Sequence, residues 1–160
     1  MSKEYTLLGI DPGSSVMGYG VIKKVQRQLS VVQYGVLHLH RYADPTLRLQ
    51  KILEHVTALI ADFDPQEVAL EAPFYGKNAQ VMLKLGRAQG MAIAAALMEE
   101  VSFVEYAPRK IKQAVTGNGH ASKAQVARML ASLLGLRVLP DLLDASDALA
   151  VAVCHAYQHV

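Results

Sequence analysis

Cysteine is nearly absent from this sequence, and so is any long run of hydrophobic residues. Of the 160 residues one is a cysteine, Cys154, so no internal disulfide can form and a reducing compartment is favoured. The longest apolar stretches, residues 91–98 and 148–154, are far shorter than the ~20 residues that cross a bilayer. The first residues also lack the basic and apolar regions of a secretion signal. We therefore expect a cytoplasmic protein with no membrane span.

Linkers, repeats and a strong charge are missing as well. The 6 prolines and 11 glycines are dispersed, and no low-complexity stretch interrupts the chain. Hydrophobic residues make up 52% of the sequence, which is enough for a core. The net charge of +2 does not by itself identify a nucleic-acid-binding protein. The sequence predicts a single domain over residues 1–160.

The order of apolar runs and helical patterns predicts an α/β protein. Strands are expected at residues 5–11, 18–24, 29–39, 68–71 and 101–106, and helices at 45–63, 78–100, from 108, 122–135 and from about 144. The first three strands form an antiparallel meander, and the crossovers force parallel pairing among the first, fourth and fifth strands. We expect a mixed five-stranded sheet flanked by helices.

Two of the expected strands end in an acidic residue followed by a turn. Asp11 precedes Pro12, and Glu71 lies just before Pro73. Ligands of open α/β sheets bind beyond the carboxyl ends of the strands, so adjacent parallel strands would bring the two carboxylates together. Such carboxylates repel each other and lose solvation unless a cation is present. Each could alternatively cap its own turn.

A second acidic pair, Asp144 and Asp147, has the i and i+3 spacing that places both side chains on one face of a helix. Both are expected in the first turn of the last helix, where they could also cap free backbone amides. The rest of that helix is almost continuously apolar, so it must pack against the sheet and hold the acidic turn close to the protein body.

Four carboxylates without thiolate or imidazole partners favour a hard divalent cation. Mg²⁺ fits this ligand set, and Mn²⁺ could substitute for it. Two such ions ~4 Å apart can hold a phosphodiester, activate water and neutralise the leaving oxygen. The pattern therefore predicts a nuclease with Asp11, Glu71, Asp144 and Asp147 as catalytic metal ligands.

Several strings, taken in order, resemble the RuvC family of Holliday-junction resolvases over essentially the whole chain. They are LGIDPGS at 8–14, GYGV at 18–21, Glu71 followed by Phe74, KNA at 77–79, LKLG at 83–86 and DASDALA at 144–150. The resemblance implies a ribonuclease-H-like fold, a homodimer and paired incisions in a four-way DNA junction. It also implies partnership with a branch-migration motor and a junction-binding tetramer of the RuvB and RuvA type. The family allows histidine at the Asp144 position, so the role of that residue as ligand or base stays open.

Side chains around the expected site are candidate DNA contacts. Phe74 and Tyr75 would stack on a base, or else pack under the following helix. Basic residues in the flanking segments would contact phosphates, although many surface charges are merely solvated: Lys77, Lys84, Arg87, Lys112 and Lys123, with Arg109, Lys110 and Arg128 as further members. Lys112 and Lys123 match basic positions of the family.

Small residues recur every four positions along the long helix, at Gly86, Gly90 and Ala94. This ridge permits close approach of another element, either a second subunit, as the family implies, or the chain's own sheet.

Other functions compete with the resolvase. A non-catalytic junction-binding module would not need four acids, and small ribonuclease-H-like nucleases that process ribosomal RNA precursors lack the Phe74 and KNA segment. Sugar kinases and actin-like ATPases need a second domain.

Overall fold

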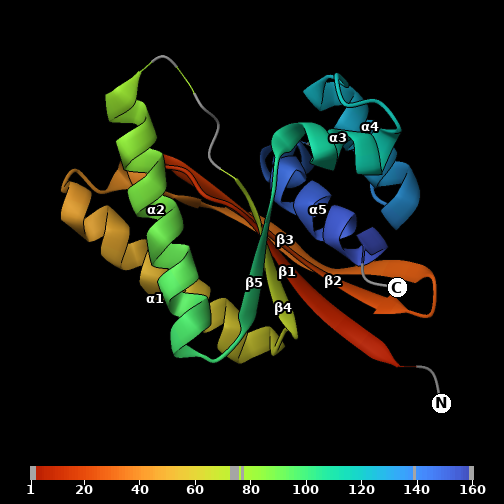
Figure 1. Cartoon of the computed structure of the whole chain (residues 1–160), viewed down its shortest axis with the longest axis horizontal. Coiled ribbons are helices and arrows are strands. Elements are labelled where there is room, and N and C mark those ends of the chain that lie inside the picture. The colour runs from red at the N-terminus through yellow and green to blue at the C-terminus, as the bar shows by residue number, and fades with distance from the viewer. Residues whose placement is uncertain (1–2, 73–75, 77, 139, 159–160) are drawn as a thin grey trace.

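A five-stranded sheet lies between two helical layers in the computed structural model of this chain (Figure 1). The structure describes residues 3–72, 76, 78–138 and 140–158. The strands are β1 (Glu4–Asp11), β2 (Val16–Val25), β3 (Gln28–His38), β4 (Glu67–Glu71) and β5 (Ser102–Tyr106). The helices are α1 (Pro45–Phe63), α2 (Ala79–Met98), α3 (Pro108–Thr116), α4 (Lys123–Leu134) and α5 (Pro140–Gln158), with a 3-10 turn, η1, at Leu39–Arg41.

The order of the strands across the sheet is β3-β2-β1-β4-β5. β2 pairs antiparallel with both β1 and β3, whereas β1 with β4 and β4 with β5 pair in parallel. The predicted mixed sheet is therefore confirmed. Because β1 and β4 are parallel neighbours with Ile10 opposite Leu70, their acidic last residues end side by side.

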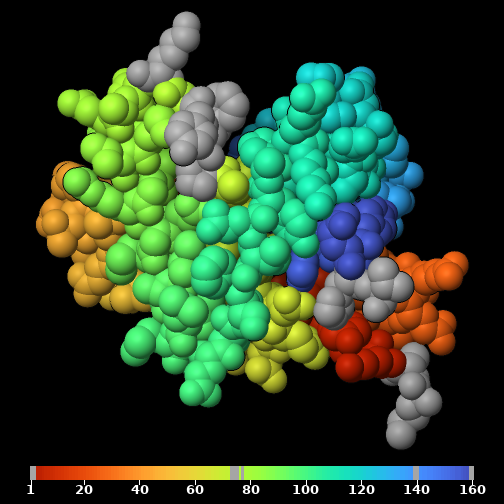
Figure 2. Space-filling view, in the orientation of Figure 1, coloured from red at the N-terminus to blue at the C-terminus, as the bar shows by residue number. Residues whose placement is uncertain are grey.

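Alternating strand residues build one core on each face of the sheet. Leu7 and Ala69 belong to the core under α3, α4 and α5, whereas Leu8 and Val68 belong to the core under α1 and α2. The surfaces of α2 and of the α3–α4 pair face each other across a hollow (Figure 2).

Helix α5 approaches the sheet closely because glycines remove side chains from its path. A Cβ added at Gly9 would lie 2.1 Å from the Ala148 carbonyl oxygen, and one at Gly20 would lie 2.5 Å from Leu149 Cδ2. At Gly9 the contact is with backbone, so this position must be glycine for α5 to sit where it does, whereas at Gly20 the Leu149 side chain would have to shift. The close fit holds the α5 backbone against β1, the strand that ends in Asp11.

Most helix boundaries agree with their capping signals, and one does not. Asp44 and Asn78 cap α1 and α2, and Ser122 with Gln125 forms the expected capping box of α4. The expected start of the last helix near residue 144 was wrong, since α5 begins at Pro140. Its first-turn acid is Asp141, so Asp144 and Asp147 lie in later turns and do not cap the helix.

One face of α2 is covered by the chain, and another is not. Its buried residues are Ala88, Gln89, Ala92, Ala95 and Ala96, and they face α1 and β5. No described atom lies within 4 Å of a Cβ added at Gly86 or Gly90, so these two positions of the ridge do not pack on the chain's own sheet. Among the described helices, only α2 is long and apolar enough to cross a membrane, judged by length and composition alone. Of its most apolar stretch of 18 residues, 28% are buried.

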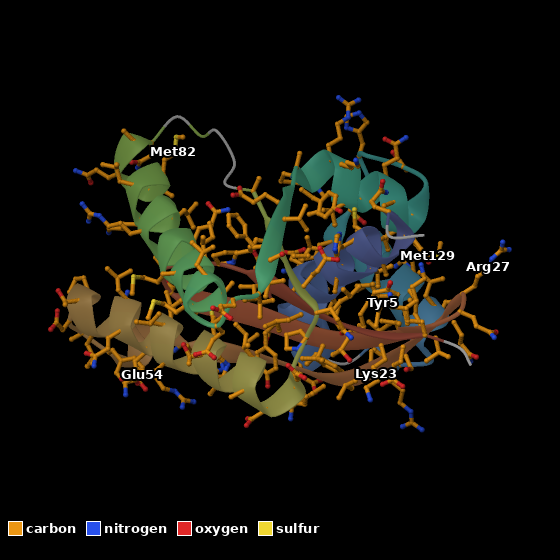
Figure 3. The ribbon with its side chains drawn as sticks, turned by 60° about the horizontal axis from the view of Figure 1, so that its bottom comes forward. Tyr5, Lys23, Arg27, Glu54, Met82 and Met129 are labelled. Carbon is orange, nitrogen blue, oxygen red and sulfur yellow. The ribbon has the colours of Figure 1, made fainter. Side chains whose placement is uncertain are left out.

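The β2–β3 hairpin extends away from α2. Its turn carries Arg27, which lies at the far side of the molecule from Met82 on α2 (Figure 3). Along β2, Val25 pairs with Glu4 while Gly18 pairs with Asp11, so this turn and the acidic end of β1 lie at opposite ends of the strand pair.

Candidate active site

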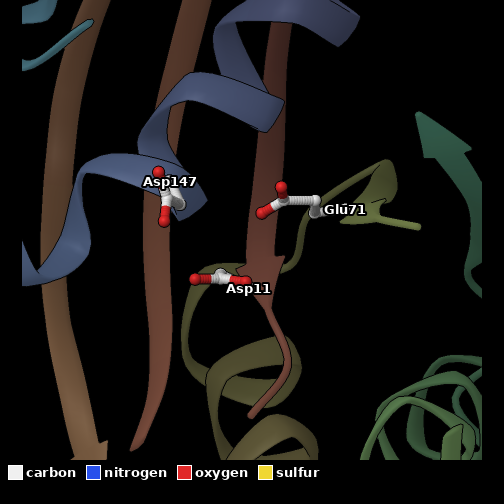
Figure 4. Close-up of side chains that lie close together, drawn as sticks. All are labelled: Asp11, Glu71 and Asp147. Carbon is white, nitrogen blue, oxygen red and sulfur yellow. The ribbon is translucent and has the colours of Figure 1, made fainter. Parts of the chain in front are cut away.

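Three carboxylates from distant parts of the sequence converge at one edge of the sheet. Asp11 ends β1, Glu71 ends β4, and Asp147 comes from α5 (Figure 4). One oxygen of each lies within 4.8 Å of the others, a spacing that a single metal ion can bridge. The parallel pairing of β1 with β4 brings the first two together, and the close packing of α5 on Gly9 supplies the third.

Burial and mutual repulsion raise the pKa values of two of these groups. The pKa of Asp11 is raised to about 6, first by burial and then by the charge of Asp147. The pKa of Glu71 is raised to about 8, by burial, by the charges of Asp11 and Asp147, and by a hydrogen bond to Asp11. Without a cation, Glu71 therefore keeps its proton near neutral pH and donates it toward Asp11.

These properties test whether a metal fits the site, and they favour one. Buried carboxylates that repel each other are stabilised in their charged form by a nearby cation. The ligands are all oxygen atoms, which hard divalent ions prefer. Three of the described carboxylates, from the ends of β1 and β4 and from α5, are thus placed so that they could hold a metal ion.

A hollow of about 260 Å³ opens onto this group. Its lining comes from the ends of β1 and β4, from α2 and from α5, and comprises Asp11, Pro12, Glu71, Ala72, Leu85, Gln89 and Asp147. The carboxylates are therefore reachable from outside, as a phosphodiester substrate requires.

Asp144 lies outside this group of carboxylates. It sits one helical turn before Asp147 and is exposed, and its oxygens are not among those that come within 4.8 Å of one another. Three of the four expected ligands thus converge, and the role of Asp144 remains a prediction.

Two of the expected DNA-contacting lysines lie beside the carboxylates. Lys123 Nζ, at the start of α4, is 3.6 Å from Asp147 Oδ2. The charge of Lys112 on α3 lowers the pKa of Glu71, and that of Lys123 lowers the pKa of Asp11. Both lysines therefore increase the positive potential at the entrance to the site.

Five of the remaining expected contacts fall into two groups. Lys84 and Arg87 are exposed on α2 and line a different hollow, together with Arg48. Phe74, Tyr75 and Lys77 lie outside the described residues.

Gln89 is a polar residue of this site that the sequence reasoning missed. It is only 6% exposed, lines the hollow above the carboxylates, and donates from Nε2 to Glu105 Oε2 at 3.0 Å. The signal was a single amide among the small residues of the α2 face that includes Ala88 and Ala92. A buried amide on such a face indicates a specific hydrogen bond, although it does not identify the partner.

A mixed sheet whose first and fourth strands end in adjacent carboxylates, completed by an acid from the last helix, defines the class of ribonuclease-H-like, metal-dependent nucleases. Residues 7–155 match the family model described as "Crossover junction endodeoxyribonuclease RuvC". The chain therefore belongs to the RuvC family.

Individual relatives agree with this assignment. A Cytophaga hutchinsonii protein named crossover junction endodeoxyribonuclease RuvC is 57% identical over 152 residues, which are 95% of this chain and 76% of that protein. The solved structure of Thermus thermophilus RuvC in complex with a Holliday-junction substrate matches with a TM-score of 0.89 and 32% identity, over 97% of this chain and 94% of that one. A yeast mitochondrial Holliday-junction resolvase, with 16% identity and a TM-score of 0.70 over 92% of this chain and 76% of that one, shares the fold.

Proposed function

We propose that this protein resolves Holliday junctions, cutting symmetrically placed strands of a four-way DNA junction by metal-dependent hydrolysis during recombination and repair. The observation that carries the proposal is the carboxylate group of Asp11, Glu71 and Asp147. It occurs in a chain that matches the RuvC family model from residue 7 to residue 155. The T. thermophilus relative is bound to such a junction, which supports the same substrate here.

Magnesium is the proposed cofactor, with manganese as a substitute and two ions during catalysis. Asp11, Glu71 and Asp147 would hold the ions, and Asp144 would serve as a further ligand or as a base. Bound there, the ions would supply an activated water and neutralise the leaving oxygen, and the cut would leave a 5′-phosphate. The chain itself provides the ordered carboxylates, and Lys112 and Lys123 provide positive charge at the entrance.

Contacts to the junction would come from several segments of the chain that flank the carboxylates in the sequence or in the fold. Phe74 and Tyr75 would stack on bases at the crossover. Lys77, Lys84, Arg87, Lys112 and Lys123 would contact phosphates and make binding depend on salt.

A homodimer is proposed through the uncovered face of α2. Its apolar side chains are exposed to an extent unusual for their type: Leu83 60%, Leu97 60% and Met98 79%. Together with Gly86 and Gly90 they form a surface that a second copy can cover, and a two-fold dimer would present two identical sites to a nearly symmetric junction. This also accounts for the apolar composition of α2 without a membrane.

Family membership extends the proposal to the whole chain and its partners. Residues 1–160 would act as one domain in the cytoplasm. A branch-migration motor and a junction-binding tetramer of the RuvB and RuvA type would deliver the junction.

Cleavage of a mobile four-way junction tests the proposal, with linear duplex, single-stranded DNA, an RNA/DNA hybrid and a structured RNA as alternative substrates, each in Mg²⁺ and in chelator. We expect Mg²⁺-dependent cleavage of the junction alone, and Asp147→Asn should abolish cleavage but preserve binding. Binding without any cleavage by the wild-type protein would indicate a junction-binding module. Preferential cleavage of the hybrid or of structured RNA would indicate a nuclease that processes RNA.

A further inference from the structure

A second hollow, of about 270 Å³, lies between the first half of α1, the middle of α2 and the loop that follows β1. We call it the basic groove. Its polar wall consists of Ser14 and Ser15 from the loop, Arg48 from α1, and Lys84 and Arg87 from α2. Its apolar floor includes Ile52 and Ala88, each only 1% exposed. Three cations and no acid line the groove among the described residues.

None of the three cations forms an ion pair with a carboxylate in the described part of the chain. Like charges gathered around one hollow repel each other, and an anion in the groove would remove that repulsion. Surface cations that serve only solubility tend to be interspersed with acids instead.

Arg48 is oriented before any ligand arrives. Its Nε donates to the Tyr42 carbonyl oxygen at 2.6 Å and its Nη1 to the Ser14 carbonyl oxygen at 3.4 Å. These bonds restrain the guanidinium, and its Nη2 makes no hydrogen bond to a described residue. A preorganised guanidinium loses less entropy when it binds a phosphate. The Ser15 carbonyl oxygen accepts from the His40 amide at 3.0 Å, so the loop is held on both sides.

The basic groove and the carboxylate hollow share a wall. Leu85 and Gln89 of α2 face the carboxylates, whereas Lys84 and Arg87, one residue before Leu85 and two before Gln89, face the groove. The loop from Asp11 to Ser15 runs from one hollow to the other. A strand whose phosphate lies at Asp11 could therefore follow this loop toward the groove.

We propose that the basic groove is a phosphate subsite that binds a phosphodiester of the cleaved strand a few nucleotides from the incision, with Arg48, Lys84 and Arg87 as its ligands. The proposal rests on the proposed nuclease function. It adds that the bound strand has a fixed register relative to the carboxylates. Holding a second phosphate would set which bond of the strand reaches the carboxylates, because the two hollows are rigidly linked by α2. Arg48, which no motif singled out, becomes the central residue of this subsite.

A junction with a single neutral phosphate tests this directly. Methylphosphonate replaces one phosphate at a time on each side of the incision, and binding is measured in chelator, where no cleavage occurs. The variants are Arg48→Gln, Lys84→Gln and Arg87→Gln. Arg27→Gln is the matched control, since Arg27 is an exposed arginine at the opposite end of the β2–β3 hairpin (Figure 3).

We expect one methylphosphonate position to weaken wild-type binding roughly three- to tenfold. Each groove variant should weaken binding of the unmodified junction by a similar factor and reduce the salt slope by about one unit. At that one position the methylphosphonate should then have no further effect on the groove variants, because variant and modification remove the same contact. In Arg27→Gln the methylphosphonate should weaken binding as much as it does in the wild type.

Folding does not obscure the result, because Lys84 and Arg87 are exposed and their variants keep every described hydrogen bond. Penalties that persist unchanged in all groove variants, or the absence of any sensitive position, would overturn the subsite while leaving junction cleavage intact. A wild-type protein that neither binds nor cuts junctions would overturn the subsite together with the proposed function. Inorganic phosphate that weakens binding of the wild type and Arg48→Gln equally would also contradict it.

Discussion

At the residue scale, the proposed chemistry depends on carboxylates whose pKa values the fold raises while no cation is bound. Asp11 and Glu71 were predictable because each ends an apolar run, and parallel strands align their carboxyl ends. Asp147 was predictable as an acid at the start of an otherwise apolar segment. Asp147 joins the group, whereas Asp144 is exposed. Which of the two faces the other carboxylates depends on how α5 is rotated about its own axis. The sequence pattern does not specify that rotation, nor the bond from Gln89 to Glu105.

The first prediction concerns the dependence of stability on pH. In the metal-free protein Glu71 has a pKa of about 8 and Asp11 a pKa of about 6, against ordinary values of 4.5 and 3.8. For each group, at pH values between its ordinary pKa and its raised pKa, the folded state binds more protons than the unfolded chain. The free energy of unfolding must therefore fall as pH rises through this range. One pKa unit corresponds to about 1.4 kcal/mol and 1 kcal/mol to roughly 2–4 °C. We expect the melting temperature in chelator to be at least ~5 °C lower at pH 8.5 than at pH 5.5.

Glu71→Gln separates this effect from other titrating groups. The neutral amide removes the repulsion, so the variant should lose most of the pH slope and melt at a higher temperature than the wild type at pH 8.5, while losing cleavage. Mn²⁺ should stabilise the wild type more at pH 8.5 than at pH 6, because the ion must displace protons from the site. Identical pH slopes for the variant and the wild type in differential scanning calorimetry would contradict the assignment.

At the scale of elements, local signals placed every strand and most helix ends, and they failed where two signals competed. Both the Pro140-Asp141 pair and the later Asp144 resemble a helix start, and propensity rules do not decide between them. The structure begins α5 at Pro140. Periodicity along α2 showed that Gly86 and Gly90 share a face, but what covers a face is decided by the packing of α1 and the sheet.

The second prediction tests the fit of α5 on β1. Gly9→Ala would place a methyl group 2.1 Å from the Ala148 carbonyl oxygen, so α5 must move away from the strand. We expect a loss of about 1–3 kcal/mol in the free energy of unfolding and a large loss of cleavage, since Asp147 moves with the helix. Urea unfolding and the cleavage rate at saturating Mg²⁺ measure both effects.

Gly18→Ala is the control for this variant. Gly18 pairs with Asp11 and faces the same helix, yet a Cβ there would meet Ala148 Cβ at 3.5 Å, an ordinary contact. Its stability and activity should stay near those of the wild type. Equal losses in both variants would mean that the close approach at Gly9 does not position Asp147.

At the scale of the whole molecule, α2 contributes to the proposed DNA-binding surface and to the proposed dimer interface. The helix separates the carboxylates from the basic groove: Leu85 and Gln89 line the carboxylate hollow, and Lys84 and Arg87 line the groove. The uncovered apolar face includes Leu83 and Leu97, each 60% exposed. A second copy bound to that face would therefore fix the two active sites relative to each other through a single rigid helix from each subunit.

The last prediction follows from that arrangement. Leu83→Asp places a charge in the centre of the proposed interface, where its desolvation would oppose association. We expect sedimentation to show a monomer at concentrations where the wild type is a dimer. A monomer has one active site, so it should nick a junction in one strand and release it before the second cut, and a cruciform plasmid would yield nicked circles instead of linear product. Leu133→Asp on α4, where the leucine is 39% exposed, is the matched control and should remain dimeric. If Leu83→Asp remains dimeric, the α2 face is not the dimer interface. If the variant is a monomer that still makes both cuts in one encounter, paired incision does not depend on the dimer.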